Sequence, residues 1–437
     1  MFICSMVSLE YKEVERQEFL MKIERIIARE LYDSQGYPTL QCEIILDTSQ
    51  SVTALVPSGI SVGLHEAAEL RDHEPRLEGK GVHKSIDTIE RYIAPILVGN
   101  EPRALELDSL LLELDGTPKK SYLGANTLLA VSMALYRAEA LWHDIELYEL
   151  FAALYEVDTV SMPLPMLNFI NGGLHANNGL SIQECLIVPV GAPTFRASFE
   201  VAVQAYHLLG KELAARGKST AVGLEGGYAP HFANDYEALD ILAQVVRQIN
   251  DQQSVTCMMA LDVAASQLAV QNGFYRWNNT VYTTQEMIDV YKELVEKYKL
   301  YSLEDPLGQD DWEGWQLLTK ELAHSVQIVG DDLFVTDSVR ITRGIQEKSA
   351  TASIIKPNQI GTITETLQAI SLCKENGLHP IVSHRSKDTE DTFIADLVVG
   401  TSAGQFKAGA PSRSERVAKY NRLLVIEDEL TFSDEER

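Results

Sequence analysis

The sequence predicts an α/β protein in which a small α+β domain precedes a (β/α) barrel. Two observations lead to this prediction. In residues 22–155, strand-like segments come first and helix-like segments follow, the order typical of an α+β domain. In residues 156–437, short apolar runs alternate with helix-like stretches. Such alternation is typical of a parallel sheet covered by helices, and roughly 250 residues suffice to close it into a barrel.

The composition narrows the range of partners. The chain has 437 residues, and 63 Asp and Glu against 37 Lys and Arg give it a net charge of −26. Nucleic acids and anionic membranes attract clustered Lys and Arg, so we expect neither as a main partner. No run reaches the roughly 20 apolar residues of a membrane helix, so we expect no membrane insertion. A local basic pocket could still bind a small anionic substrate.

The N-terminus and the cysteines indicate the compartment. Residues 1–21 are mixed and charged, lack the basic segment of a signal peptide, and are expected to form an extension outside the fold. The five cysteines are odd in number, widely spaced and without a Cys-x-x-Cys pair. Neither a disulfide framework nor a zinc site is expected, so we expect a cytoplasmic protein. A secondary location at the cell surface stays open.

The elements of the α+β domain follow from local patterns. Residues 39–46 partly alternate and carry the aliphatic residues of a strand, after a turn-like segment at 33–38. Residues 52–63 predict a strand that runs into a Gly- and Ser-rich loop, either a hinged lid or a plain turn. Residues 84–97 are amphipathic, and the Ala-rich residues 123–142 predict a buried helix.

The apolar runs of the second domain end in groups that can do chemistry. These are Asp262, Glu304 with Asp305, Asp331, Lys356, His384 and Lys407. Their successive spacings of 42, 27, 25, 28 and 23 residues each accommodate one strand, one helix and two loops. Because the active site of a (β/α) barrel lies at the C-terminal strand ends, we expect these side chains to meet in one mouth.

Three of these strand ends are acidic. Carboxylates of Asp262, Glu304 and Asp331 would repel one another in the barrel mouth unless a cation neutralised them. Oxygen ligands without His or Cys favour Mg²⁺. The alternative is that strand-end acids cap helices or contact solvent, which explains one such residue more easily than three in succession.

The next three strand ends are cationic and carry Lys356, His384 with Arg385, and Lys407. A cationic arc that faces a metal-loaded acidic arc suits a substrate with phosphate and carboxylate groups. A lysine between cations and a metal can have its pKa lowered, which would let it act as a base. The alternative is ordinary ion pairing of these cations with the three acids, without a metal.

Three further features lie outside the strand ends. The segment GLEGGYAP (223–230) lacks the Gly-x-Gly-x-x-Gly order of a phosphate-binding loop and by itself predicts a tight turn. His175 lies in a loop rich in Gly and Asn, where a plain loop residue is a more common interpretation than a ligand. Glu184 lies in an apolar run, and a buried acid needs a partner, which weakly indicates a functional role.

Ordered motifs occur throughout residues 22–430, among them VPSGISVGLHEAAELRD, PLPMLNFINGGLHANN, GLEGGYAP, LEDPLGQDDW, IKPNQIGT and VSHRSKDTEDTFIADLVVG. Together these motifs resemble those of the enolase family. The resemblance implies an α+β domain at 22–155 that caps an enolase-type ββαα(βα)6 barrel at 156–437, usually in a homodimer or an oligomer of dimers. It also implies the glycolytic lyase phosphopyruvate hydratase, which interconverts 2-phosphoglycerate and phosphoenolpyruvate plus water with two Mg²⁺ ions, the second bound with the substrate.

The resemblance also assigns roles position by position. Lys356 matches the base that takes the α-proton, and Glu225 matches the acid that assists loss of hydroxide. Two further residues share the catalytic assignment, Glu184 and the loop residue His175. The metal ligands are Asp262, Glu304 and Asp331, with Ser61 of the lid loop for the second ion. Substrate binding is assigned to His175, Gln183, Glu184, His384, Arg385, Ser386 and Lys407.

Four departures from the family pattern bear on the site. Leu224 replaces an aspartate before the acid, and the lid loop reads Gly-Ile-Ser-Val-Gly, with Val62 in place of a threonine. Lys387 replaces a glycine and is expected to put an extra cation beside the phosphate groups. Gln35 replaces an arginine that often pairs across the dimer with a C-terminal glutamate, here Glu427, so the dimer contact is in doubt.

These departures keep two alternatives open. One is a paralogue that uses the same chemistry on a related phospho- or phosphono-carboxylate, since the changes lie beside the acid, the lid and the phosphate groups. The other is a non-catalytic binding or scaffold protein with the same fold. Retention of Lys356 and Glu225 argues against the second, because unused sites tend to lose such residues first.

Overall fold

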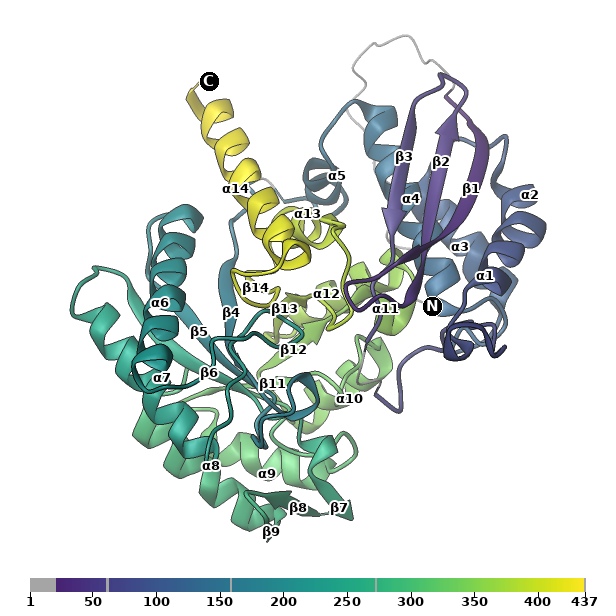
Figure 1. Cartoon of the computed structure of the whole chain (residues 1–437). Coiled ribbons are helices and arrows are strands. Elements are labelled where there is room, and N and C mark those ends of the chain that lie inside the picture. Colours follow the sequence, from purple (N-terminus) through teal and green to yellow (C-terminus); the bar gives the residue numbers. More distant parts are fainter. Residues whose placement is uncertain (1–20, 60–62, 158, 272, 436–437) are drawn as a thin grey trace.

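A computed structural model describes residues 21–59, 63–157, 159–271 and 273–435. Residues 1–20 of the expected extension at 1–21, and Ser61, lie outside the described residues, whereas Met21 packs against the core. An N-terminal domain with a three-stranded sheet lies beside a closed eight-stranded barrel surrounded by helices (Figure 1). The fold class that the sequence predicts is confirmed. In the described part, no helix is long and apolar enough to cross a membrane. The described cysteines are all buried and free: Cys42, Cys185, Cys257 and Cys373.

The N-terminal sheet is antiparallel and contains β1 (Ile23–Tyr32), β2 (Pro38–Leu46) and β3 (Ser51–Leu55). The turn before β2 closes on Asp33, whose Oδ1 accepts hydrogen bonds from the backbone N–H groups of Gln35 and Tyr37. Alternate residues of β2 are fully buried, which is the period of a half-buried strand. Helix α4 (Ala125–His143) packs against β2 and β3 and is the buried helix that its Ala-rich pattern predicts.

The remaining helices of this domain are α1 (His83–Thr88), α2 (Ala94–Leu97), α3 (Ala104–Asp115) and α5 (Leu147–Leu154). The amphipathic segment 84–97 does not form one regular helix, because a π-helical turn at Ile89–Ile93 separates α1 from α2. Pro95 lies in the first turn of α2, where its missing N–H group would have no intrahelical partner in any case.

The barrel strands are β4 (Leu164–Asn171), β5 (Glu184–Val190), β6 (Thr256–Asp262), β10 (Ser302–Glu304), β11 (Gln327–Gly330), β12 (Ala352–Ile355), β13 (His379–Ser383) and β14 (Gln405–Lys407). The sheet closes in the order β10-β11-β12-β13-β14-β4-β5-β6. The expectation of a uniformly parallel sheet is wrong at β5, which is antiparallel to both β4 and β6. A buried strand has the same apolar pattern in either direction, so only the ββαα(βα)6 order implied by the resemblance included this reversal.

Helices surround the barrel, namely α6 (Phe195–Ala215), α7 (Asp235–Asn250), α8 (Thr284–Tyr298), α9 (Trp312–Leu322), α10 (Ser338–Glu347), α11 (Pro357–Ile360), α12 (Ile363–Glu375), α13 (Phe393–Gly400) and α14 (Ser414–Glu435). Six of them begin at a side chain that accepts a hydrogen bond from their first turn: Thr194, Asn234, Thr283, Asp311, Asp337 and Thr362. Such caps are the usual start signal of a helix. These caps determine where the six helices begin.

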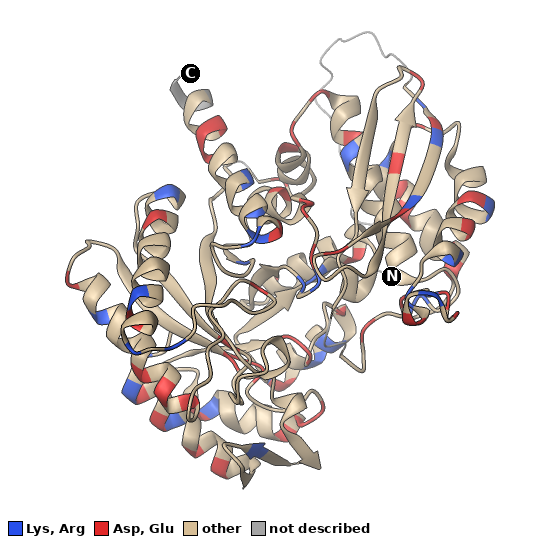
Figure 2. Ribbon diagram, viewed as in Figure 1, with Lys and Arg blue, Asp and Glu red and all other residues tan. Residues whose placement is uncertain are grey.

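A small antiparallel sheet of β7 (Ala269–Gln271), β8 (Phe274–Trp277) and β9 (Thr280–Thr283) interrupts the strand–helix repeat after β6. It accounts for the 42-residue spacing between Asp262 and Glu304, which exceeds the other spacings. Apolar side chains fill the barrel interior: Met166, Leu186, Val188, Ala260, Val329, Ala352, Ile354 and Ile381. Charged residues of both signs are spread over the outer helices (Figure 2). The barrel is therefore a packed core, and its chemistry is confined to its ends.

An ion pair joins the two domains, and we predict that its loss destabilises the fold. Arg137 of α4 donates from Nη2 and Nη1 to Asp391 Oδ1 at 2.7 Å and Oδ2 at 2.8 Å. Leu55 N donates to the same Oδ2, and the Asp391 side chain is 8% exposed. Asp391→Asn leaves the arginine charge without its anion and should lower the free energy of unfolding by about 3 kcal/mol.

Urea denaturation measures this loss. The matched control is Glu43→Gln, which removes the more exposed ion pair between Glu43 and Arg29 and should cost less than about 1 kcal/mol. Equal losses in the two variants would contradict a special role for the pair between the domains.

A second prediction concerns Glu139 of α4, whose Oε2 accepts a hydrogen bond from Ala104 N at the start of α3. Burial raises the pKa of this carboxyl from 4.5 to about 7. The folded state therefore binds the proton more tightly than the unfolded chain. The stability that Glu139 contributes is greatest below about pH 4.5 and falls as pH rises to about 7.

The Glu139→Gln variant keeps an oxygen acceptor for Ala104 N but does not titrate. We expect the free energy of unfolding of the wild type relative to this variant to fall between pH 4.5 and 7. Thermal or urea unfolding at a series of pH values measures the difference. A difference that is constant across this range would show that Glu139 does not titrate in the folded protein.

Candidate active site

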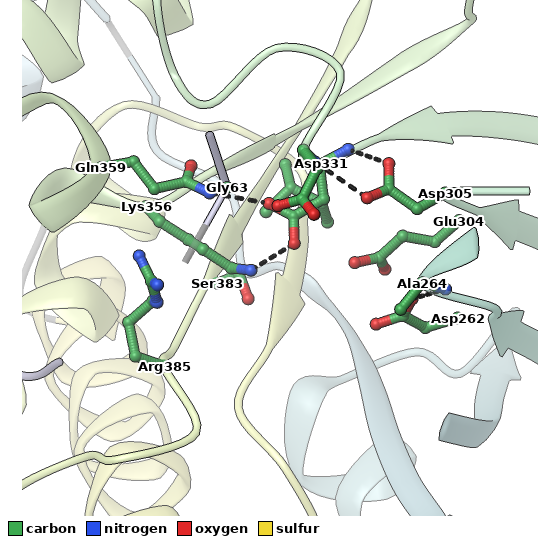
Figure 3. A network of polar contacts seen from close by, with 12 residues as sticks. Gly63, Asp262, Ala264, Glu304, Asp305, Asp331, Lys356, Gln359, Ser383 and Arg385 are labelled. Carbon is green, nitrogen blue, oxygen red and sulfur yellow. Dashed lines mark hydrogen bonds and ion pairs between the residues drawn. The ribbon is translucent and has the colours of Figure 1, made fainter. Parts of the chain in front are cut away.

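The barrel brings the chemically capable strand ends into one mouth (Figure 3). Asp262 ends β6, Glu304 ends β10, and the two are register partners in adjacent parallel strands. Asp331 and Lys356 directly follow β11 and β12. Lys407 ends β14. The prediction that these side chains converge agrees with their positions in the structure.

Lys407 lies at the centre of one acidic group. Its Nζ donates to Asp262 Oδ2 at 3.0 Å and to both oxygens of Glu304 at 2.9 and 2.8 Å. Glu184 Oε2 also lies close to this nitrogen, at 3.2 Å. Burial alone would lower the pKa of Lys407, but the surrounding carboxylates raise it well above its usual value. Lys407 is therefore a fixed positive charge.

Lys356 belongs to a second group. Its Nζ lies 2.5 Å from Asp331 Oδ2, and Gln359 Nε2 donates to the other oxygen of Asp331 at 3.0 Å. Burial is the largest single influence and would lower the pKa of Lys356, but nearby carboxylates, Asp331 first and then Glu304, together raise it. The expectation of a lowered pKa concerns a lysine beside a bound metal and stays a prediction; without a metal, the close ion pair with Asp331 favours the charged amine.

Two further carboxylates lie beside Asp331: Asp305, which the sequence analysis named as a strand-end group without giving it a role, and Asp332, which it did not name. Oxygen atoms of Asp305, Asp331 and Asp332 all lie within 4.8 Å of one another. Asp305 also accepts hydrogen bonds from the backbone N–H groups of the other two, at 2.8 and 2.9 Å. Burial and the Asp332 carboxylate raise the pKa of Asp305 well above its usual value. The signal in the sequence was the pair of consecutive acids in each of the segments LED (303–305) and GDD (330–332).

The strand ends of the acidic side have unusual backbone conformations. Ala264, Asp305 and Val335 have φ values of +49°, +41° and +45°, although none of them is glycine. Left-handed backbone is especially unfavourable for a β-branched residue such as valine, and it persists where the surrounding structure enforces it. Such residues cluster at functional sites, which agrees with the position of these three after β6, β10 and β11.

His175, Glu184 and Glu225 form a cluster on the other side of the mouth. His175 Nδ1 lies 3.6 Å from an oxygen of each carboxylate. Its side chain is 4% exposed and faces both carboxylates, so it does not point to solvent, and its assigned role stays a prediction. Burial lowers the pKa of His175 to about 4, which leaves the ring neutral at physiological pH. Burial and the Glu225 carboxylate raise the pKa of Glu184.

The reversed strand explains the position of Glu184. Glu184 is the first residue of β5, and its register partner on the antiparallel neighbour is Asp262 at the end of β6. An antiparallel strand contributes its N-terminal end to the edge at which its neighbours end. An acid at the start of an apolar run therefore reaches the same mouth as acids at the ends of other runs.

Glu225 is held by a glycine-rich turn, as the segment GLEGG predicts. Gly223 N donates to Gly227 O at 2.7 Å. Gly226 has a φ of +85°, and a Cβ atom there would lie 2.6 Å from the Ser412 carbonyl oxygen. Asn168 of β4 donates from Nδ2 to Glu225 Oε2 at 3.0 Å. Glycine is therefore required at 226, and Asn168 is a contact of the acid that sequence reasoning missed.

His384 connects Glu225 to a buried arginine. Arg416 Nη1 lies 2.6 Å from His384 Nδ1 and can only donate, so Nδ1 accepts and the ring proton is on Nε2. Nε2 lies 3.5 Å from Glu225 Oε1. Burial and the Arg416 charge lower the pKa of His384 well below its usual value, so the ring is neutral. Arg416, also missed from the sequence, donates to the carbonyl oxygens of Arg385 and Ser386 as well.

The other assigned residues lie around the same mouth. Arg385 and Ser386 follow β13 and are both buried. Gln183 Nε2 donates to Asp262 Oδ2 at 3.3 Å, and its Oε1 accepts from Gln267 Nε2 at 2.9 Å. Ser61 lies outside the described residues, so its assignment stays an expectation from the resemblance.

The structure shows the contacts of two residues named with the departures. The Lys387 ammonium lies 4.5 Å from the centroid of the Tyr37 ring, which Lys80 approaches to 3.7 Å. Lys387 therefore packs on the N-terminal domain, and the expectation that it places a cation beside the phosphate groups is not supported. Glu427 accepts hydrogen bonds from the N–H groups of Phe195 and Arg196 at the start of α6, within the same chain.

The acidic side of the mouth fits a divalent cation. Burial and the Asp262 carboxylate raise the pKa of Glu304 well above its usual value, because Lys407 alone does not compensate the negative charges there. The donor atoms of Asp262, Glu304 and Asp331 are carboxylate oxygens, the hard ligands that Mg²⁺ prefers. The ion pairs of Lys407 and Lys356 agree equally with the alternative of pairing without a metal.

Comparisons with known proteins cover nearly the whole described chain. The family model of the enolase N-terminal domain matches residues 23–151, and that of the enolase C-terminal TIM barrel domain matches residues 159–435. An enolase of Natranaerobius thermophilus is 46% identical over 410 residues, which cover 93% of this chain and 95% of the relative. An enolase of Acidothermus cellulolyticus is 48% identical over 411 residues, with 93% and 94% covered. The chain therefore belongs to the enolase family.

Proposed function

We propose that the protein is a Mg²⁺-dependent phosphopyruvate hydratase that interconverts 2-phosphoglycerate and phosphoenolpyruvate plus water. The observation that carries the proposal is the position of the two candidate proton-transfer groups around the barrel. Lys356 follows β12, whereas Glu225 contacts Asn168 of β4 and lies beside Glu184 of β5. Strands β12 and β5 are four positions apart in the eight-membered ring. The two groups therefore approach a molecule in the mouth from opposite sides.

The reaction divides into two proton transfers. Lys356 Nζ accepts the proton from the carbon next to the substrate carboxylate, and the electrons of that C–H bond move into the carboxylate as an enolate. When the enolate collapses, the C–C double bond forms and the neighbouring C–O bond breaks. The Glu225 carboxyl donates its proton to the departing hydroxyl, so water leaves. Base and acid thus act at adjacent carbons, as general acid–base catalysis requires.

The mouth supplies positive charge where negative charge develops. Bound Mg²⁺, held by Asp262, Glu304 and Asp331 with Ser61 for a second ion, would stabilise the doubly charged carboxylate of the enolate. Lys407 adds a permanent cation among these acids. Lys356 must be neutral before it can accept a proton, and its pair with Asp331 opposes this. A cation that binds the Asp331 carboxylate would weaken its attraction for the Lys356 ammonium and so favour the neutral amine of Lys356.

The remaining groups would hold the phosphate and carboxylate of the substrate. Arg385, Ser386 and the neutral His384 come from one loop after β13, which Arg416 fixes through its backbone and the His384 ring. Gln183 and His175 would contact the substrate from the opposite side of the mouth.

We extend the proposal to domains at 22–155 and 156–437, a homodimer or an oligomer of dimers, and a cytoplasmic location. Family membership supports these points.

Removal of the base tests the proposed reaction. We predict that Lys356→Ala lowers kcat by at least about 10³-fold, because it removes the amine after β12 that would accept the α-proton. The absorbance of phosphoenolpyruvate formed from 2-phosphoglycerate, with Mg²⁺ and after its removal by a chelator, measures the loss. Wild-type turnover should require the metal.

No turnover of 2-phosphoglycerate by folded, Mg²⁺-treated wild type would overturn the proposal. Turnover of a related phospho- or phosphono-carboxylate would then identify the protein as a paralogue with the same chemistry. Leu224 favours this second candidate, because the family's aspartate at this position is absent beside the acid. No turnover of any such acid would favour a binding role.

The two-sided arrangement predicts that the proton transfers can be separated. In Glu225→Gln the shape of the side chain is kept but the acidic proton is lost, so formation of phosphoenolpyruvate should fall at least about 10²-fold. Exchange of the α-proton with deuterated water depends on Lys356 and should continue. NMR of 2-phosphoglycerate in D2O measures the exchange, and equal loss of both activities would contradict separate roles.

A further inference from the structure

Arg385 has two side-chain partners to which no role has been assigned. Its Nη1 donates to Glu66 Oε2 at 2.9 Å and to Asn358 Oδ1 at 3.0 Å. Its Nη2 donates to Glu66 Oε1 at 3.2 Å. The Arg385 and Glu66 side chains are only 4% and 5% exposed. The guanidinium therefore makes a two-pronged, desolvated contact with one carboxylate, the geometry that directs an arginine most strongly.

Glu66 and Asn358 also bind backbone groups of the N-terminal domain. Glu66 Oε1 accepts a hydrogen bond from Gly63 N at 2.9 Å, and Asn358 Nδ2 donates to Pro57 O at 3.4 Å. Gly63 itself lies close to the acidic cluster, because a Cβ atom there would be 2.9 Å from Asp332 Oδ1. Glu66 is thus tied both to Arg385 and to the chain beside the acids.

The charges around Arg385 indicate that Glu66 keeps the guanidinium from turning toward the acidic cluster. The arginine lies beside Lys356, across from Asp305, Glu304 and Asp262 (Figure 3). Its charge contributes to lowering the pKa of Asp331, so the two groups interact. A buried guanidinium without its carboxylate partner would turn toward the next available anion. In this mouth that anion is Asp331 or a neighbour, which would remove Arg385 from its position facing a bound ligand.

We propose that Glu66 is a positioning residue that holds Arg385 in the orientation in which it binds a phosphate group of the substrate, with Asn358 as the second support. The inference rests on the proposed function only in that Arg385 contacts an anionic substrate. Glu66 does not touch the ligand; besides accepting the hydrogen bond from Gly63 N, its carboxylate acts on the site through Arg385.

The experiment compares Glu66→Gln with the full-length wild type. Calorimetric titration with inorganic phosphate in the presence of Mg²⁺ reports anion binding without turnover, and steady-state assays with 2-phosphoglycerate separate KM from kcat. For Glu66→Gln we expect the Kd for phosphate and the KM to rise about tenfold or more, with kcat changed less than about threefold. A tenfold change in Kd corresponds to about 1.4 kcal/mol.

The matched control is Glu69→Gln. Glu69 belongs to the same segment, pairs with Arg71 at 2.8 Å, and affects the pKa of Arg385 through its charge without a hydrogen bond to it. The two variants lose the same charge, but only Glu66→Gln loses contact with Arg385. We expect Glu69→Gln to bind phosphate as the wild type does. Equal weakening in both variants would mean that charge, not positioning, is responsible, and would overturn the inference.

The remaining outcomes are also decisive. Unchanged or tighter phosphate binding by Glu66→Gln would overturn the inference, as would a wild type that binds no phosphate. A wild type that binds phosphate with the expected dependence on Glu66 but does not convert 2-phosphoglycerate would support the inference and overturn the proposed function. If Glu66→Gln does not fold, Asn358→Ala replaces it, and a rise in Kd of threefold or more is then expected.

Discussion

The pairing of buried carboxylates with buried lysines is the constraint on which the rest of the site depends. Lys407 contacts Asp262, Glu304 and Glu184, and Lys356 contacts Asp331, all at the C-terminal edge of the barrel. Neither group would be stable alone, because an unpaired buried charge is costly. The carboxylates of Asp262, Glu304, Asp305, Asp331 and Asp332 outnumber the two lysines, and burial together with neighbouring carboxylates raises the pKa of Glu304 and of Asp305. This excess of negative charge is what makes a divalent cation a suitable ligand.

The topology of the barrel places these charged groups on two sides of one site. Parallel strands deliver Asp262, Glu304 and Lys407 at their ends, whereas the reversed β5 delivers Glu184 at its beginning. Glu225 reaches the same space from a turn in which Gly226 is required by its close approach to the Ser412 carbonyl oxygen. Candidate acid and candidate base therefore come from different parts of the ring, so each can have its own environment.

The N-terminal domain takes part in the site through a small number of buried contacts. Glu66 binds Arg385, Ala67 N donates to Gln359 O at 2.8 Å, and Gln359 in turn binds Asp331. A domain that folds around its own sheet thus helps to orient two side chains of the barrel. Contacts of this kind explain why the family pattern extends over both domains, although the proposed metal ligands and proton-transfer groups lie in the barrel apart from Ser61.

Much of the fold and the site followed from local patterns. Apolar runs of strand length, each ending in Asp, Glu, Lys or His at nearly regular spacing, predict a barrel and its functional edge, because side chains at the ends of parallel strands must meet. The direction of β5 could not be predicted in this way, since a buried strand is apolar in either direction. The strands β7–β9 were missed as well, although the longer spacing after Asp262 was their signal.

The sequence by itself determined which chemical groups are present and that most of them share one end of a barrel. The tertiary structure decided how they pair. It showed that His175 is buried between two carboxylates, that Lys387 contacts Tyr37, and that the pKa of Lys356 is raised. Only the tertiary structure could settle these points, because ion pairing and desolvation depend on distances of a few ångströms between residues far apart in the chain.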